Sequence, residues 1–149
     1  MSVKMIDVSS KDEIHREAVA RGCIKLRKET VSRIKSGVIE KGDVFTASAL
    51  AAIQAAKQTF LLLPFCHVIR IDLVRPSIWI EDDEKVCVEV SVKARERTGV
   101  EMEALTAVSL ALLNIWDMVK AYEKDENGQY PHTAIENIHI VRKTKVTLS

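Results

Sequence analysis

Hydrophobic residues alternate with polar residues most regularly in residues 85–95. Four successive alternate positions there are valines: Val86, Val88, Val90 and Val92. A period of two residues is typical of a β-strand with one buried face. Weaker patterns of the same kind predict strands over residues 18–27, 68–80 and 135–146. Gly22 inside the first of these indicates a bulge or a close approach of another element.

Three other segments predict helices. Residues 28–36 form a short helix that Gly37 can close. Residues 43–63 form an alanine-rich helix, which Asp43 or Thr46 can cap and Pro64 ends. The longest helix covers residues 99–124, and its apolar positions recur at helical spacing. The stripe that should pack on the sheet consists of Leu105, Val108, Leu112, Ile115 and Val119.

The order of elements is strand, two helices, strand, strand, helix, strand. This order predicts an α+β fold of the ferredoxin-like, split βαβ type. We therefore expect a four-stranded antiparallel sheet with the helices packed on one face. Because no repeat or low-complexity linker interrupts the chain, residues 1–149 are treated as a single domain.

The composition is that of an ordinary globular protein. Of the 149 residues, 47% are apolar and 29% charged, and the formal net charge is +1. A chain so nearly neutral has no field that would hold a long polyanion, so nucleic-acid binding is not expected. A pocket for a small phosphorylated ligand needs only a few cations and stays possible.

Cys23, Cys66 and Cys87 are odd in number and far apart, which argues against a disulfide or a structural zinc site. The N-terminus has no signal-peptide pattern, and the apolar run 47–64 contains too many polar residues to span a bilayer. These features predict a soluble, cytoplasmic protein with no membrane partner.

The longest helix carries a second, polar face with Glu103, Asp117 and Lys120. A solvated face with one weak ion pair would explain it. Leu110 and Leu113 share this face, however, and favour a surface covered by another subunit. At the start of the helix, Thr98-Gly-Val-Glu101 has the spacing of a capping box, so Glu101 is expected to serve as a cap.

Several cationic positions are candidates for binding phosphate. Lys41 precedes Gly42 in a turn at the start of a helix, where backbone N–H groups and an ammonium can converge on an anion. Lys57 either extends to the surface or enters a polar pocket. His67 follows a helix end and has no second ligand at a fixed spacing, so we expect no catalytic metal. Cys66 is expected to be a packing residue rather than a nucleophile.

Three motifs together carry a family resemblance. They are Lys41-Gly-Asp-Val44, Leu63-Pro-Phe-Cys-His67 and Thr98-Gly-Val-Glu-Met-Glu-Ala-Leu-Thr106 with the following Asp117-Met-Val-Lys120. Over residues 5–124 the chain resembles the MoaC family, the cyclic pyranopterin monophosphate synthases of molybdenum-cofactor biosynthesis. That resemblance implies a lyase that converts 3′,8-cyclo-7,8-dihydro-GTP to cyclic pyranopterin monophosphate with release of pyrophosphate.

The resemblance also implies a site and an assembly. The expected catalytic residues are Lys41, His67, Asp117 and Lys120. The expected substrate-binding residues are Phe65, Cys66, His67, Met102, Glu103, Lys57 and Glu101. Asp117 and Lys120 would transfer protons, each holding the pKa of the other in range, while Lys41 and His67 would engage phosphates. We expect no cofactor, and a hexamer built as a trimer of dimers with active sites between subunits.

The chain departs from the family pattern at two places. Many members read Cys-His-Pro where this chain reads Cys66-His67-Val68. Many also end in a Ser-Gly-Gly-Lys-Ser-Gly stretch, which residues 141–149 lack. Either that tail is dispensable or one of Arg142, Lys143 and Lys145 replaces its cation.

Two other functions are weighed against the lyase. A non-catalytic binding module of the same fold is disfavoured, because a decayed site would lose its charged residues first. RNA binding through the sheet is disfavoured because the clearest strand, residues 85–95, offers no aromatic side chain for base stacking.

Overall fold

The alternating valines lie on one of the two inner strands of a four-stranded antiparallel sheet, which is the predicted type of sheet. In the computed structural model, which describes residues 1–148, all four are fully buried on one sheet face. The strands are β1 (Ile14–Lys25), β2 (Ile71–Asp82), β3 (Lys85–Glu96) and β4 (Ala134–Val146). Their order across the sheet is β2-β3-β1-β4, and every neighbouring pair is antiparallel. This is the predicted split βαβ arrangement.

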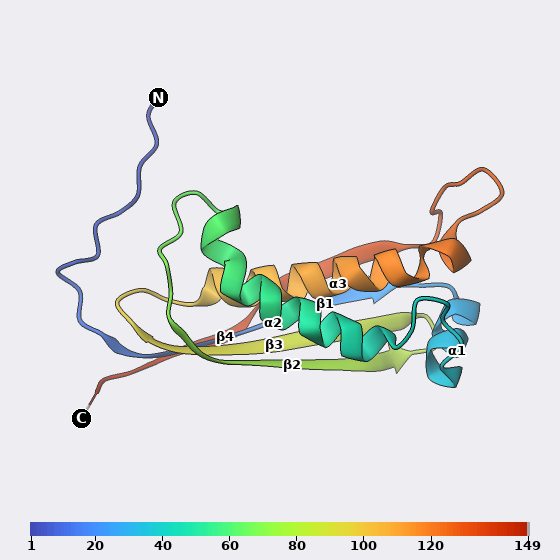
Figure 1. Cartoon of the computed structure of the whole chain (residues 1–149), viewed down its shortest axis with the longest axis horizontal. Coiled ribbons are helices and arrows are strands. Elements are labelled where there is room, and N and C mark those ends of the chain that lie inside the picture. The colour runs from blue at the N-terminus through green and yellow to red at the C-terminus, as the bar shows by residue number, and fades with distance from the viewer. Residues whose placement is uncertain (149) are drawn as a thin grey trace.

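Three helices complete the fold: α1 (Lys28–Ser36), α2 (Val44–Leu62) and α3 (Glu101–Glu123). Figure 1 shows α2 and α3 side by side across one face of the sheet, with α1 at one end. The core lies between these two layers. On α3, Val108, Leu112, Ile115 and Val119 are fully buried, as the helical spacing predicted, whereas Leu105 is only half-buried.

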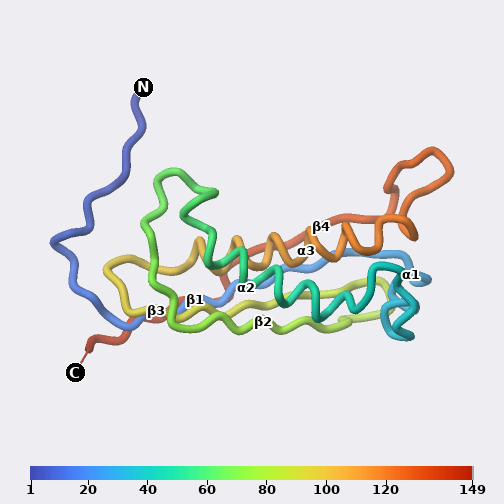
Figure 2. Tube along the Cα trace, viewed as in Figure 1, coloured from blue at the N-terminus to red at the C-terminus, as the bar shows by residue number. Residues whose placement is uncertain are grey.

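The chain trace in Figure 2 places the first and the last described residues at the same end of the molecule, where the first residues extend away from the sheet. The loop after α2 and the loop before α3 lie at this end too. The opposite end holds α1, the loop into α2 and the loop between α3 and β4. A different group of loops therefore lies at each end of the α2–α3 pair.

Gly22 allows α3 to approach β1 closely. A Cβ atom placed on it would lie 2.8 Å from Cγ1 of Ile138 and 2.9 Å from Cδ1 of Leu112. The pairing of β1 with β4 also shifts register between Arg21 and Cys23. Both readings of this glycine, a close approach and a bulge, are thus confirmed.

The cysteine prediction is wrong. Cys23 and Cys87 face each other directly across β1 and β3 and form a disulfide. They are 64 residues apart in the chain, and only the strand register brings them together. A single disulfide between neighbouring strands leaves no spacing motif in a sequence, which is why counting cysteines missed it.

Helix α3 is long and apolar enough to cross a membrane by length and composition. Half of its most apolar stretch is buried within the domain, however. We therefore interpret α3 as the core helix of a soluble protein, in which the sheet and α2 cover its apolar residues.

Candidate active site

Three of the predicted catalytic side chains meet at one end of the α2–α3 pair. Nζ of Lys41 lies 3.0 Å from Oδ2 of Asp117, and Nζ of Lys120 lies 3.0 Å from Oδ1 of the same carboxylate. Lys41 also donates a hydrogen bond of 3.2 Å to the backbone oxygen of Asp117. We call Lys41, Asp117 and Lys120 the lysine cluster.

The antiparallel packing of α2 and α3 creates this cluster, because the start of α2 lies beside the last turns of α3. The Asn114 amide on α3 donates to the Ser48 hydroxyl on α2 at 3.1 Å. Asp43 caps α2 by accepting a hydrogen bond of 3.1 Å from the Thr46 backbone N–H. Gly42, with a φ of 112°, lets the chain turn from Lys41 into that cap.

Tyr122 on α3 holds the loop that carries Lys41. Its hydroxyl accepts a hydrogen bond of 2.8 Å from the backbone N–H of Glu40, the residue before Lys41. The Arg33 guanidinium lies 4.6 Å from the centre of the Tyr122 ring, a cation–π contact that helps fix the ring. The sequence reasoning missed Tyr122, because an aromatic residue near a helix end carries no sign of such a bond.

Glu123 joins three elements at the same end of the domain. Its carboxylate is fully buried. It accepts hydrogen bonds from the hydroxyls of Thr30 and Thr133 and from the backbone N–H of Arg27. The start of α1, the end of α3 and the residue before β4 are thus connected through one side chain. A buried carboxylate with this many donors was not foreseen from the sequence.

The ion pairs of the lysine cluster shift the pKa values of Asp117 and Lys120 away from neutral pH. The hydrogen bond from Lys41, then that from Lys120, lowers the pKa of Asp117. The hydrogen bond to Asp117 in turn raises the pKa of Lys120. The prediction that the two groups hold each other's pKa in range is therefore wrong for the chain without substrate, since pairing stabilises both charged forms.

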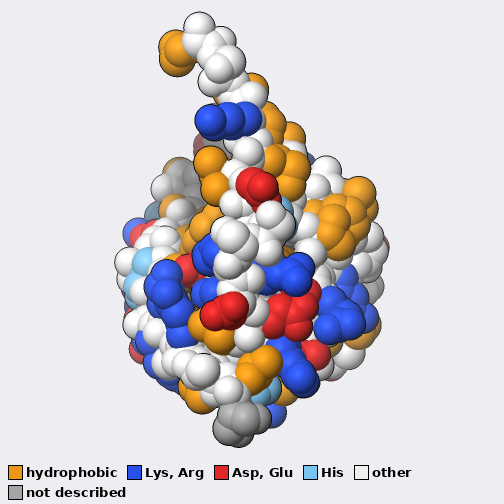
Figure 3. All heavy atoms as spheres, turned by 90° about the vertical axis from the view of Figure 1, so that its left-hand side faces the viewer, with side chains coloured by type: hydrophobic (Ala, Val, Ile, Leu, Met, Phe, Trp, Pro, Cys, Tyr) orange, Lys and Arg blue, Asp and Glu red, His pale blue; other side chains and the backbone are white. Residues whose placement is uncertain are grey.

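The remaining predicted binding residues, apart from Lys57, gather at the opposite end. A cavity of about 710 Å³ lies between the loop after α2 and the start of α3. Its lining includes Phe65, Cys66, His67, Glu101 and Met102. We call these five residues together with Glu103 the thiol cluster. Figure 3 views this end of the molecule, where acidic and basic side chains lie among hydrophobic ones beneath the projecting N-terminal segment.

Glu103 is buried, contrary to its predicted place on a polar face. Its side chain is 2% exposed, and Oε2 accepts a hydrogen bond of 3.6 Å from the Cys66 thiol. Among the described residues, Oε1 of Glu103 has no hydrogen-bond partner. Burial raises the pKa of Glu103. Burial, reinforced by the charge of Glu103, also raises the pKa of Cys66 to about 11, so the thiol is not a ready nucleophile.

Glu101 pairs with Lys143 of β4 instead of capping α3. The helix has Val100 at its N-cap without a side-chain cap, so the capping-box prediction is wrong. The Lys143 ammonium lies 2.8 Å from Oε1 of Glu101. Burial alone would raise the pKa of Glu101, but the hydrogen bond and charge of Lys143 outweigh burial and lower it. A Cβ atom on Gly99 would lie 1.9 Å from Oε2 of Glu101, so a larger residue at this position would displace the Glu101 carboxylate.

The last two predicted residues differ in their surroundings. Nε2 of His67 lies 2.7 Å from the backbone oxygen of Ile6, and because a carbonyl only accepts, this nitrogen carries the proton. The N-terminal segment thereby contacts the thiol cluster. Lys57 is exposed on α2 and belongs to neither cluster, which matches the surface alternative.

The two clusters lie far apart in one chain. Glu103 and Asp117 are both on α3, and fourteen residues of helix correspond to about 21 Å. One small ligand bound at either end therefore contacts only one cluster of a given chain. Among the described residues, the one group of Cys, His and carboxylate side chains close enough to hold a metal belongs to neither cluster.

Comparisons with known proteins place the chain in a family. The family model described as "MoaC family" matches residues 5–145. A probable cyclic pyranopterin monophosphate synthase of Sulfurisphaera tokodaii is 57% identical over 95% of this chain and 93% of its own length. A protein of the same description from Methanococcoides burtonii is 54% identical over 97% of this chain and 91% of its own length.

A third relative carries a different description. A probable cyclic pyranopterin monophosphate synthase accessory protein of Methanothermobacter thermautotrophicus is 47% identical over 98% of this chain and 91% of its own length. The family match covers nearly the whole chain, including both clusters. The predicted resemblance is thereby confirmed, and the chain belongs to the MoaC family.

Proposed function

We propose that this chain is a cyclic pyranopterin monophosphate synthase of molybdenum-cofactor biosynthesis. Its relatives of 57% and 54% identity bear that description over nearly their full length. The reaction converts 3′,8-cyclo-7,8-dihydro-GTP to cyclic pyranopterin monophosphate and pyrophosphate. It takes place in the cytoplasm, and the lysine cluster and the thiol cluster supply the reacting side chains.

The active site is formed between two copies of the chain, with the lysine cluster of one copy facing the thiol cluster of the other. The separation of about 21 Å along α3 carries this proposal, because a single chain cannot bring both clusters to one substrate. Exposed apolar residues on the outer sides of α2 and α3 provide a surface for the second copy. Leu50, Leu61 and Leu113 are 63%, 69% and 54% exposed. A hexamer, as a trimer of dimers, is the expected assembly.

The lysine cluster suits the triphosphate. Lys41 and Lys120 place two ammonium groups within one hydrogen bond of the same carboxylate. When the cyclic phosphate forms, a sugar hydroxyl gives its proton to a base and its oxygen bonds to the α-phosphorus, while the bond from that phosphorus to the β-phosphate bridging oxygen breaks. Pyrophosphate leaves with that oxygen and its electrons, and cations beside it stabilise the growing charge. His67 of the other copy also binds a phosphate group of the same substrate.

Substrate binding also activates Asp117 as a base. In the chain without substrate, Lys41 and Lys120 hold the pKa of Asp117 low. Phosphate oxygens that take over the lysine hydrogen bonds leave Asp117 with fewer donors, so its pKa rises and it accepts protons more readily. Lys120 returns protons during the rearrangement of the purine-derived ring. Glu103 contributes an acceptor for ring N–H groups through its unpartnered oxygen.

The deciding experiment is turnover of freshly prepared 3′,8-cyclo-7,8-dihydro-GTP, with the pterin product and pyrophosphate identified by mass spectrometry. Asp117→Ala and Lys41→Ala are the matched inactive variants, and Lys93→Ala, an exposed lysine of β3 that pairs with Glu17, is the control for a lysine outside the predicted site. Product from wild type and Lys93→Ala, and not from the cluster variants, is expected. A folded wild type that forms no product refutes the catalytic role.

The relative described as an accessory protein supports a second candidate function. This relative is 47% identical to the chain and is described as an accessory protein of the synthase rather than as the synthase itself. An accessory role predicts that wild type yields no product alone and increases product formation by another synthase. Adding this chain to a slow preparation of a second family member distinguishes the two functions.

A further inference from the structure

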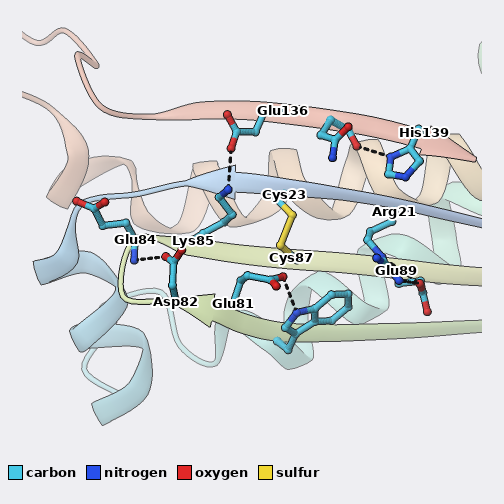
Figure 4. Close-up of a disulfide and its surroundings, with 12 residues drawn as sticks. Arg21, Cys23, Glu81, Asp82, Glu84, Lys85, Cys87, Glu89, Glu136 and His139 are labelled. Atoms are coloured by element: carbon cyan, nitrogen blue, oxygen red, sulfur yellow. Dashed lines mark hydrogen bonds and ion pairs between the residues drawn. A yellow bond between two sulfur atoms is a disulfide. The ribbon is translucent and has the colours of Figure 1, made fainter. Parts of the chain in front are cut away.

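The disulfide lies on the sheet face that the helices leave uncovered. Figure 4 shows Cys23 on β1 and Cys87 on β3 joined across this face, with charged side chains around them. The sheet separates the pair from α2 and α3 and from both clusters. Cys23 is half-buried, so a small reductant can reach its sulfur, while Cys87 is fully buried.

A carboxylate from the neighbouring strand lies beside the two sulfurs. Glu81 near the end of β2 brings an oxygen to within 4.8 Å of both Cys23 Sγ and Cys87 Sγ. The Trp79 indole N–H donates a hydrogen bond of 3.0 Å to Oε2 of Glu81 and so orients the carboxylate. Trp79 is itself the β2 residue paired with Cys87. Donors that orient a ligand in this way are a regular part of metal sites.

These three side chains form a donor set for a soft divalent cation. Two thiolates and one carboxylate suit Zn²⁺, which takes four ligands in a tetrahedron. With sulfur–zinc bonds of about 2.3 Å, the sulfurs would lie roughly 3.8 Å apart. Cys23 and Cys87 sit directly opposite each other with their Cα atoms 4.0 Å apart, so side-chain rotation alone can open that space. Glu81 is exposed, which leaves room for water as a fourth ligand.

We propose that Cys23, Cys87 and Glu81 form a redox-controlled site for Zn²⁺ or a similar ion. In the oxidised chain, the disulfide excludes the ion. A cellular dithiol reductant transfers two electrons and two protons to the pair, which gives two thiols and the disulfide of the reductant. Each cysteine thiol then loses its proton when the ion binds. The ion replaces the covalent bond as the link between β1 and β3, so the sheet stays joined in both redox states.

Cobalt(II) tests this proposal, because thiolate ligands give Co²⁺ an intense charge-transfer absorption. The intact chain is reduced with a phosphine, freed of reductant and titrated with Co²⁺ and then with Zn²⁺. One Co²⁺ per chain, a thiolate band and displacement by Zn²⁺ are expected, with none of these before reduction. The absence of a band in folded, reduced protein overturns the proposal, as does reduced protein that unfolds and is not refolded by Zn²⁺.

Matched variants locate the ion. Cys23→Ser removes the band, and Glu81→Gln weakens Co²⁺ binding by about tenfold or more. Glu84→Gln changes a neighbouring exposed carboxylate, and Cys66→Ser removes the one cysteine outside the disulfide; both keep the band. A band that survives in Cys23→Ser, or one that disappears in Cys66→Ser, contradicts the assignment.

Discussion

The Lys41 ammonium lies 3.0 Å from the Asp117 carboxylate, although the two residues are 76 positions apart in the chain. One belongs to the loop before α2 and the other to the last turns of α3. Their contact depends on the antiparallel packing of these helices and on the bond between Glu40 and Tyr122 that fixes the loop. The lysine cluster is therefore a product of the tertiary structure and is sensitive to residues outside it.

Tyr122→Phe is expected to loosen the lysine cluster. The substitution removes the hydroxyl that accepts the Glu40 N–H and keeps the ring beneath Arg33. Lys41 then bonds less often to Asp117, so the pKa of Asp117 rises toward its ordinary value. Because Lys41 binds phosphate in the proposed site, KM should increase more than kcat falls. Carbon-13 NMR titration of the Asp117 carboxyl measures the pKa. Tyr130→Phe is the control, and an equal shift in both variants contradicts a positioning role for Tyr122.

Glu103 is expected to make stability depend on pH. Its pKa is raised in the folded chain, so its stabilising contribution is complete below its ordinary value of 4.5. That contribution is lost as the pH rises through the higher pKa of the folded state. Glu103→Gln should therefore stabilise the chain at pH 8 by about 1–3 kcal/mol and change little at pH 4. Urea unfolding at the two pH values measures the difference, and equal effects at both would refute it.

Glu123→Gln is expected to destabilise the chain by about 1–3 kcal/mol, because an amide N–H₂ replaces an acceptor among several donors. The buried carboxylate accepts from Thr30, Thr133 and the Arg27 backbone N–H. Chemical denaturation followed by circular dichroism gives the free energy of unfolding. Glu126→Gln, an exposed position in the following loop, should leave it unchanged. A loss of stability no larger than that of the control would show that the hydrogen bonds of Glu123 contribute little.

Reduction of the disulfide is expected to lower the free energy of unfolding when no metal is present. The bond closes a loop with a sequence separation of 64 residues, for which chain entropy gives about 4 kcal/mol. Thermal unfolding with and without a phosphine reductant, in the presence of a chelator, measures the change. Cys23→Ser should behave like the reduced wild type and show no further response to reductant. A melting temperature that reduction leaves unchanged would mean that the bond does not constrain the unfolded chain.

The fold could be predicted from the sequence because each element has its own local pattern. The alternation of residues 85–95 depends only on which sheet face is buried. Helix α2 ends at Leu62, two residues before Pro64, because proline has no backbone N–H to continue the helix. The order of elements then leaves few ways to form an antiparallel sheet. The predicted α+β class and strand order were confirmed for this reason.

The candidate site could be predicted only as a set of residues. A helical wheel for α3 assumes one covering surface, the sheet, and so placed Glu103 on a polar face. The loop after α2 covers α3 from a second side, and Cys66 on this loop contacts Glu103. Lys143 likewise draws Glu101 away from the cap that its spacing suggested. These contacts join elements distant in sequence and depend on how the elements pack.

A site formed between two copies is tested most directly by complementation. Asp117→Ala disables the lysine cluster and His67→Ala disables the thiol cluster, and each variant alone should be inactive. If the two chains are unfolded together and refolded, the mixed pairs contain one intact site, so about one quarter of wild-type activity is expected from random pairing. The same variants refolded separately and then combined are the control. A mixture that stays inactive while forming mixed oligomers would contradict an active site shared between chains.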